Sequence, residues 1–350
     1  MRIVRRCSAS LAVLLCASAA LAQGLTSRTQ VEELSKSDVL LDVVVTPKNG
    51  GAPVTGLTQQ DFTLTDNKAP QAITLFRAVG GSEAPVAVTV AIDAVNTSST
   101  SLGLERSEID RFFKANNGNM TYPTQLAIFT DKGTQIQKGF TKDGNALSGT
   151  LDHDVLGLRD ITRSAGFYGA AERLQLSIKT LLQLAKYEAT LPGRKLVLWV
   201  SPGWPILEGP RVEITAKQQR EIFDTITGLS RALREARVTL YSIDPLGTAD
   251  AGSLRLFYYK DFLKGVRKPE QTGFGDLALQ VIAAQTGGLV LNSSNDVVAL
   301  LDQAVADSNA FYELSFDPVK GEPDEYHQIE VKVGKSGLVA RTRTGYYSGK

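Results

Sequence analysis

Cysteine and histidine are almost absent from this chain, which has two of each among 350 residues. Both cysteines, Cys7 and Cys16, lie in an N-terminal segment that we expect to be cleaved off, so the mature chain would have no thiol. This excludes disulfides, cysteine metal ligands and cysteine nucleophiles. The two imidazoles, His153 and His327, leave few ways to build a zinc site or a Ser-His-Asp triad.

The chain also lacks an excess of charge of either sign. Its formal net charge is +1, and loss of Arg2, Arg5 and Arg6 with the N-terminal segment would leave about −2, which is +1 minus 3. No basic face is evident, so we expect no nucleic-acid partner. The chain also has no G-x-S-x-G elbow, no Walker A loop and no G-x-G-x-x-G loop after a strand. We therefore expect no enzymatic activity.

An apolar run long enough to span a membrane is missing as well. Residues 11–22 are apolar, follow a basic segment and end in Ala20-Leu21-Ala22, which is typical of a signal peptide of residues 1–22. A membrane helix needs about 20 apolar residues, so this stretch is too short to be one. We expect an exported protein, periplasmic or secreted, with no membrane span. About 328 residues (350 minus 22) would remain, enough for roughly two domains.

The first part of the mature chain, residues 30–80, reads as a small antiparallel β module. Strand-forming residues are separated by turn clusters rich in glycine, asparagine and aspartate, and a linker at 80–85 closes the module. The predicted strands are 39–45, 62–65 and 72–76.

Residues 85–308 have the pattern of an α/β domain. Near-continuous apolar strands alternate with helical periodicity, as in the stripe of Leu174, Ile178 and Leu181. This order predicts a doubly wound, mostly parallel sheet. Within the domain, residues 246–275 form a long insertion with one short helix expected at 257–263. The predicted strands are 86–93, 125–130, 195–201, 238–243 and 288–292.

Strand character returns in residues 309–350, at 311–316, 327–333 and 339–344. These strands have no partner of their own kind nearby in the sequence. We expect them to pack with residues 30–80 into one antiparallel β-sandwich, with the α/β domain inserted between its halves.

Several short motifs, in a fixed order along the chain, carry a family resemblance. They are VTGLTQQDF at 54–62, IDAVNT at 92–97, YSIDPLG at 241–247, FYEL at 311–314 and RTGYY at 343–347. Together they resemble the secreted bacterial VWFA-related proteins, a group met especially in Acidobacteria, over essentially the whole mature chain. The resemblance implies a von Willebrand factor type A-like domain that binds or adheres rather than catalyses.

The resemblance also implies where a metal-ion-dependent adhesion site would lie. Open α/β sheets bind ligands at the carboxyl ends of their strands, and the family site has D-x-S-x-S at the end of the first strand. Here Asp93 and Thr97 are present, but Val95 replaces the first serine, and Ser201-Pro202-Gly203 stands where Asp-Gly is expected. We therefore expect a degenerate site with no resident cofactor and at most weak Mg²⁺ or Mn²⁺ binding by Asp93 and Thr97.

Two substitutes for the distal threonine of that site, Thr162 and Ser164, are only loosely placed. For Asp93 the alternative to metal binding is hydrogen bonding to nearby backbone amides. His153, between two aspartates, is either a general base or a solvated loop residue.

Ligand-binding candidates gather after the strand ends. Ser98 either donates to a ligand or caps the following helix, and Asp131 and Asp244 either form an acidic rim or satisfy turn amides. Trp204 and the Phe257-Tyr258-Tyr259 run are candidate exposed interface anchors, with covering of the sheet edge as the alternative. The candidates are Asp93, Asn96, Thr97, Ser98, Asp131, Ser201 and Trp204.

Three functional hypotheses follow. The first is an extracytoplasmic, non-enzymatic protein that binds or scaffolds a protein partner with little or no metal dependence. The second is an adhesion protein that depends on Mg²⁺ or Mn²⁺ held in a non-standard site. The third is a hydrolase hidden in the 246–275 insertion, which no residue of that segment supports.

Overall fold

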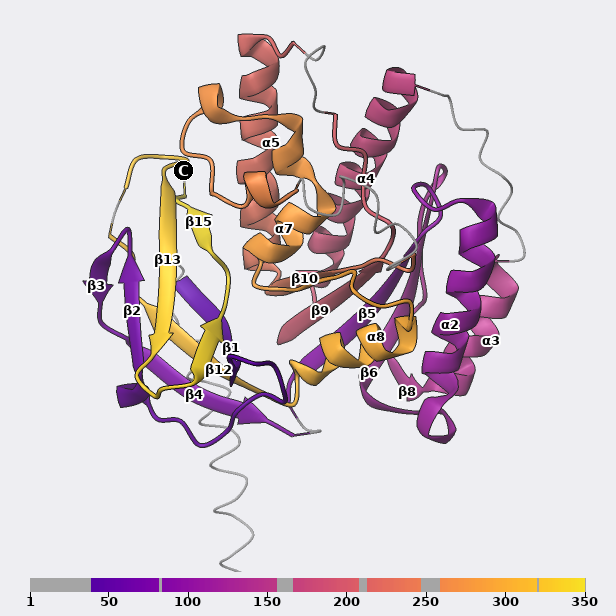
Figure 1. Cartoon of the computed structure of the whole chain (residues 1–350), viewed down its shortest axis with the longest axis horizontal. Helices are drawn as coiled ribbons and strands as arrows, with labels where there is room; N and C mark the ends of the chain where they lie inside the picture. Colours follow the sequence, from indigo (N-terminus) through magenta and orange to yellow (C-terminus); the bar gives the residue numbers. More distant parts are fainter. Residues whose placement is uncertain are drawn as a thin grey trace, which may run out of the picture. The chain divides into compact units, whose positions relative to one another are not determined.

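The computed structural model describes residues 39–81, 84–155, 166–207, 213–246, 259–319 and 321–349 (Figure 1). The chain divides into two compact units, Met1–Val39 and Leu40–Lys350. The signal-peptide prediction for residues 1–22 therefore lies outside the described residues, as do Thr162, Ser164, Phe257 and Tyr258. In the part that is described, no helix combines the length and apolarity needed to cross a membrane.

A seven-stranded, mostly parallel sheet forms the centre of the α/β domain. Its strand order is β11-β10-β9-β5-β6-β7, with β8 also paired to β6. Strands β11 to β6 along this order are parallel, while β7 and β8 run antiparallel to β6. The strands are β5 (Val86–Asp93), β6 (Asn119–Thr130), β7 (Gly133–Ile136), β8 (Thr141–Asp143), β9 (Arg194–Val200), β10 (Val238–Ile243) and β11 (Val290–Leu291). The predicted α/β fold class is confirmed.

The apolar strand runs are explained by burial on both faces of the sheet, since every residue of β9 and β10 is buried. One apolar cluster joins one face to α2 (Ser99–Gly118), α3 (Gly144–Val155) and α8 (Val297–Ala306). A second joins the other face to α4 (Gly166–Glu188), α5 (Ala216–Glu235) and α7 (Leu279–Gln285) (Figure 1). The helices therefore cover both faces, as a doubly wound sheet requires.

Two four-stranded antiparallel sheets combine strands from both ends of the chain. Their orders are β14-β1-β12-β4 and β15-β13-β2-β3. Strands β1, β2 and β4 pair with β14, β13 and β12 respectively, so residues from before and after the α/β domain share both sheets. The strands are β1 (Val39–Pro47), β2 (Phe62–Asp66), β3 (Ala69–Gln71), β4 (Leu75–Gly80), β12 (Ala310–Phe316), β13 (Tyr326–Val333), β14 (Leu338–Arg341) and β15 (Gly345–Tyr347).

Some predicted boundaries are wrong. The strand expected at 72–76 is instead β4 at Leu75–Gly80, and the strand expected at 288–292 is reduced to the two residues of β11. The short strands β7 and β8 were not predicted, because neither carries an apolar pattern of its own. In the insertion, the helix expected at 257–263 is a 3₁₀ turn at Tyr259–Phe262.

The β strands are joined to the α/β domain by buried ion pairs. Arg237, at the start of β10, donates to Asp42 on β1 at 2.5 Å and to Glu313 on β12 at 2.7 Å. The Glu313 side chain is fully buried and also pairs with Arg77 on β4. Removing one partner of such a pair leaves an uncompensated buried charge, so the contact holds these elements in one arrangement.

Candidate functional site

The candidate site lies where β5 ends and the chain turns into α2. Asp93 is the last residue of β5, and its side chain is fully buried. The Ser98 side chain accepts a hydrogen bond from the Ser101 amide at 3.1 Å and so caps α2. Of the two roles expected for Ser98, the structure shows the helix cap.

The Asp93 carboxylate accepts hydrogen bonds at both of its oxygens. Oδ1 accepts the backbone amides of Val95 at 3.1 Å and Asn96 at 2.9 Å. Oδ2 accepts the Asn96 side-chain amide at 2.8 Å and the Trp199 indole N–H at 3.0 Å. Asp93 thus accepts hydrogen bonds from nearby donors, the role that we expected as the alternative to metal binding. Its pKa is raised by burial, while the hydrogen bonds from Asn96, Trp199 and Ser201 act in the opposite direction.

These donors occupy the acceptor positions of the carboxylate that a cation would need. A carboxylate oxygen surrounded by N–H groups faces positive dipoles, which repel a dication instead of ligating it. Val95 lies in the apolar cluster with Trp199 and has no ligating atom. Among the described residues, no group of three or more His, Cys, Asp or Glu side chains is placed to hold a metal ion. The residues around Asp93 do not fit a resident Mg²⁺ or Mn²⁺.

A second buried carboxylate, Glu105, is a site residue that the sequence reasoning missed. It lies on α2 and is only 1% exposed. Burial raises its pKa well above the ordinary value of 4.5, the charges of Asp93 and Asp244 raise it further, and a hydrogen bond with Thr97 opposes the rise. A signal was available, because Glu105 shares the buried helical stripe of Leu102, Ile109 and Phe112.

The remaining acidic candidates do not form a rim. Asp244 follows β10 and accepts the Leu246 amide at 2.9 Å, which is the turn role expected as its alternative. Asp131 is exposed in the turn between β6 and β7. The structure therefore groups Asp93, Glu105 and Asp244 as a buried acidic cluster and places Asp131 outside it.

Ser201 and Trp204, after β9, are both buried. Ser201 accepts the Gly203 amide at 3.1 Å and hydrogen-bonds to Asp93. The Trp204 side chain is 0% exposed and packs edge-on against Trp199, with ring centroids 5.4 Å apart. The prediction of Trp204 as an exposed anchor is wrong, because residues 201–204 fold back over the sheet, helped by a positive φ of 103° at Gly203.

His327, the described imidazole, belongs to a different part of the molecule. Its Nδ1 lies 2.9 Å from Asp66 Oδ2 in the β-sheet module, and Tyr346 donates to the same oxygen at 2.9 Å. All three residues are buried. For His153 the side chain lies outside the described part of the structure.

Exposed apolar side chains lie in the first two turns of two helices. Leu104, in the second turn of α2, is 63% exposed, and Phe167 and Tyr168, in the first turn of α4, are 48% and 86% exposed. Asn96 donates to Ser177 of α4 at 2.9 Å, which places the middle of that helix beside Asp93. Phe167 precedes Ser177 by ten residues, about 15 Å of helix, so it lies beyond the strand ends. We call Leu104, Phe167 and Tyr168 the apolar rim.

No family model and no curated protein matches this chain. Solved structures with some similarity include the SpRpn10 VWA domain, at 14% identity over 67% of this chain and 98% of that one, with a TM-score of 0.27. They also include human Sec24c of the COPII coat, at 10% identity over 78% and 46%, with a TM-score of 0.34. A third is the pilus adhesin SpaC from Lactobacillus rhamnosus GG, at 10% identity over 89% and 48%, with a TM-score of 0.38.

The chain thus spans about half the length of Sec24c and of SpaC. At these identities and scores the similarity carries no conclusion about function. The strand order of the central sheet follows only from the hydrogen-bonded strand pairs of this chain.

Proposed function

We propose that this chain is an exported, non-enzymatic protein that binds a protein partner through the carboxyl-end face of a von Willebrand factor type A-like domain, without a resident metal. Export rests on the signal-peptide pattern of residues 1–22, and the bacterial VWFA-related assignment rests on the motif resemblance. The choice of face rests on the apolar rim.

The apolar rim is the observation that carries the binding proposal. Phe167 and Tyr168 pack edge-to-face with ring centroids 6.0 Å apart, so each ring orders the other while both remain exposed. Aromatic side chains held in this way lose little entropy on binding and are common anchors of protein interfaces. Leu104 is a further exposed apolar side chain, on α2.

Metal independence is supported by the hydrogen bonds around Asp93. In the alternative of Mg²⁺- or Mn²⁺-dependent adhesion, Asp93 would have to release the Trp199 and Asn96 donors before it could ligate. Each buried donor left without a partner costs about 1–3 kcal/mol. We therefore favour binding through side-chain contacts over metal-mediated capture of a carboxylate.

The proposal is tested by affinity capture with matched surface variants. Wild-type protein, the double variant Phe167→Ser/Tyr168→Ser and the control variant Val339→Ser are each incubated with an envelope extract of the source cells. Val339 is also an exposed apolar residue, at 44%, but lies on β14 away from the rim. We expect a specific partner to be retained by the wild type and by Val339→Ser in the presence of EDTA, and to be lost with the double variant. Equal capture by all three proteins would refute the proposed face.

A further inference from the structure

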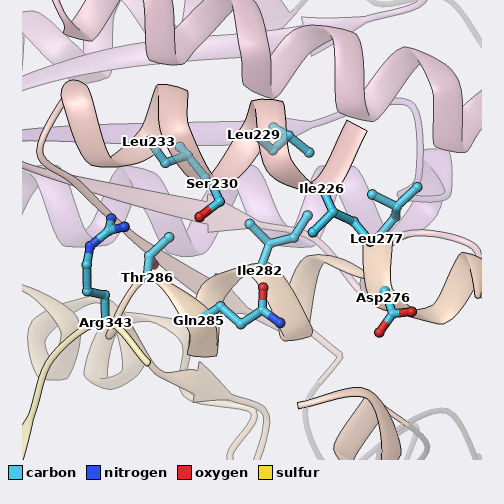
Figure 2. Close-up of a pocket in the computed structure, with 10 residues that line it drawn as sticks. All are labelled: Ile226, Leu229, Ser230, Leu233, Asp276, Leu277, Ile282, Gln285, Thr286 and Arg343. Atoms are coloured by element: carbon cyan, nitrogen blue, oxygen red, sulfur yellow. The ribbon is translucent and has the colours of Figure 1, made fainter. Parts of the chain in front are cut away.

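An arginine-rich pocket lies between the end of α5, the start of β10 and the segment before β15. Its polar lining includes Asp42, Arg234, Arg237, Thr342 and Arg343, and it encloses about 280 Å³ including its open mouth. We call these five residues the arginine pocket. A neighbouring pocket of about 350 Å³ shares Arg343 and Thr286 with it. Figure 2 shows Arg343 at one end of that second pocket, with Asp276 at the opposite end.

Among the described residues, two of the three guanidinium groups have no carboxylate within ion-pair distance. Arg237 is paired with Asp42 and Glu313. Within the described part of the chain, Arg234 and Arg343 have no carboxylate at ion-pair distance and donate no side-chain hydrogen bond. Arg343 is nevertheless only 8% exposed. Buried arginines are ordinarily paired, whereas the buried Arg343 and the half-buried Arg234 bring two guanidinium charges to this pocket without an ion-pair partner among the described residues.

The same pocket contains polar atoms that lack partners. Arg234 Nε, Arg237 Nε and Thr342 Oγ1 are buried and have no hydrogen-bond partner among the described residues. Buried donors in native proteins are nearly always satisfied by protein, water or ligand. Three such atoms around one hollow, on two segments about a hundred residues apart in sequence, therefore indicate a group that accepts hydrogen bonds.

Electrostatics agrees with this geometry. Burial and, second, the charge of Arg234 lower the pKa of Arg343 to about 10, although Asp42 and Tyr326 act in the opposite direction. Burial likewise lowers the pKa of Arg234. The folded chain thus holds like charges together in a poorly hydrated place, an arrangement that a bound anion would stabilise.

We propose that the arginine pocket binds a small oxyanion with two negative charges, of the phosphate or sulfate type. The two unpaired guanidinium groups match the charge of a dianion, and their planar N–H forks suit tetrahedral oxyanions. Thr342 adds a hydroxyl donor. The pocket adjoins the start of β10, whereas Asp93 lies at the end of β5. Because these strands run in the same direction, the two places are at opposite ends of the strands, and this site is separate from the carboxyl-end face.

The bound anion would also connect the α5–β10 segment of the α/β domain with the segment that follows β14. Arg234 and Arg237 come from the end of α5 and the start of β10, whereas Thr342 and Arg343 follow β14 and Asp42 lies on β1. A ligand that contacts residues on both sides stabilises the folded state in which they meet.

The test is thermal unfolding of the mature chain, with inorganic phosphate or sulfate added at low millimolar concentration and the ionic strength matched with NaCl. We expect a saturable rise in Tm of about 2–4 °C at roughly ten times Kd. Arg343→Gln and Arg234→Gln should each abolish the rise, and Arg343→Lys should weaken it. The control Arg220→Gln removes an exposed arginine of the same helix and should keep the full rise. Calorimetric titration with phosphate should give one site per chain.

Several outcomes would overturn the proposal. An equal rise in Arg343→Gln or Arg234→Gln would show a general salt effect on the protein surface. An equal rise with acetate would show that a dianion is not required. In chloride alone, Arg343→Gln should be as stable as the wild type or more so, because an unpaired buried charge is removed. If Arg343→Gln does not fold, Arg234→Gln still tests the site, because Arg234 is only half-buried. An unaltered rise in Tm with phosphate in Arg234→Gln would then refute the site.

Discussion

The indole N–H of Trp199 donates to Oδ2 of Asp93 at 3.0 Å. The donor comes from β9 and the acceptor ends β5, and these two strands are neighbours in the central sheet. A carboxylate held in this way acts as an acceptor for the turn that follows it. This hydrogen bond connects the apolar core to the position where the family resemblance would place a metal site and where we expected at most weak binding.

Trp199→Phe should lower the free energy of unfolding by about 1–3 kcal/mol more than the smaller ring alone would, because a buried carboxylate loses a hydrogen-bond donor. The matched control is Trp204→Phe, since Trp204 packs against Trp199 but its Nε1 has no partner among the described residues. Urea unfolding followed by circular dichroism measures the difference between the two variants. Equal losses would mean that the Asp93 hydrogen bond contributes nothing measurable.

Glu105→Gln should remove part of the pH dependence of stability. The pKa of Glu105 is raised on folding, so above pH 4.5 the folded state keeps a proton that the unfolded state releases. Wild-type stability should therefore fall as the pH rises above the ordinary carboxyl value of 4.5, and Glu105→Gln should flatten this slope and be the more stable protein at the upper end of the range in which Glu105 loses its proton. Melting temperatures across this range, with the exposed Glu221→Gln as control, provide the check. An unchanged slope in Glu105→Gln would assign the pH effect to other groups.

Mg²⁺ or Mn²⁺ at millimolar concentration should leave the melting temperature of the mature chain within about 1 °C of its value in EDTA. Asp93→Asn should lower stability by about 1–3 kcal/mol with or without metal, because its amide nitrogen would face donors already present. A saturable metal-induced rise that Asp93→Asn abolishes would instead establish the metal-dependent alternative.

Trp204→Ala should cost about 3–5 kcal/mol, the loss expected when a large aromatic side chain is removed from a core. Tyr168→Ala, in contrast, should change stability by no more than about 0.5 kcal/mol, because its side chain is 86% exposed. Urea midpoints of the two variants compare these sites directly. A small loss for Trp204→Ala would contradict its placement in the core.

The order of strands and helices could be predicted because it depends on local patterns. The runs at 86–93 and 238–243 are mostly apolar without a strict alternation, as is typical of a sheet buried on both faces. The shared β sheets were predicted from a different consideration, that the short strand sets at the two ends of the chain are each too small alone. Strand limits were less accurate, as for β4, because pairing partners decide where a strand begins.

The sequence by itself determined that Asp93 ends an apolar strand of a doubly wound sheet and that Val95, two residues later, has no ligating atom. Only the tertiary structure decided what that position does. The Val95 and Asn96 donors to Asp93 are local, but the Trp199 indole comes from 106 residues away, and no local pattern encodes such a contact. The same holds for Glu105, Trp204 and the arginine pocket, because burial and the absence of a charge partner are properties of the packed chain.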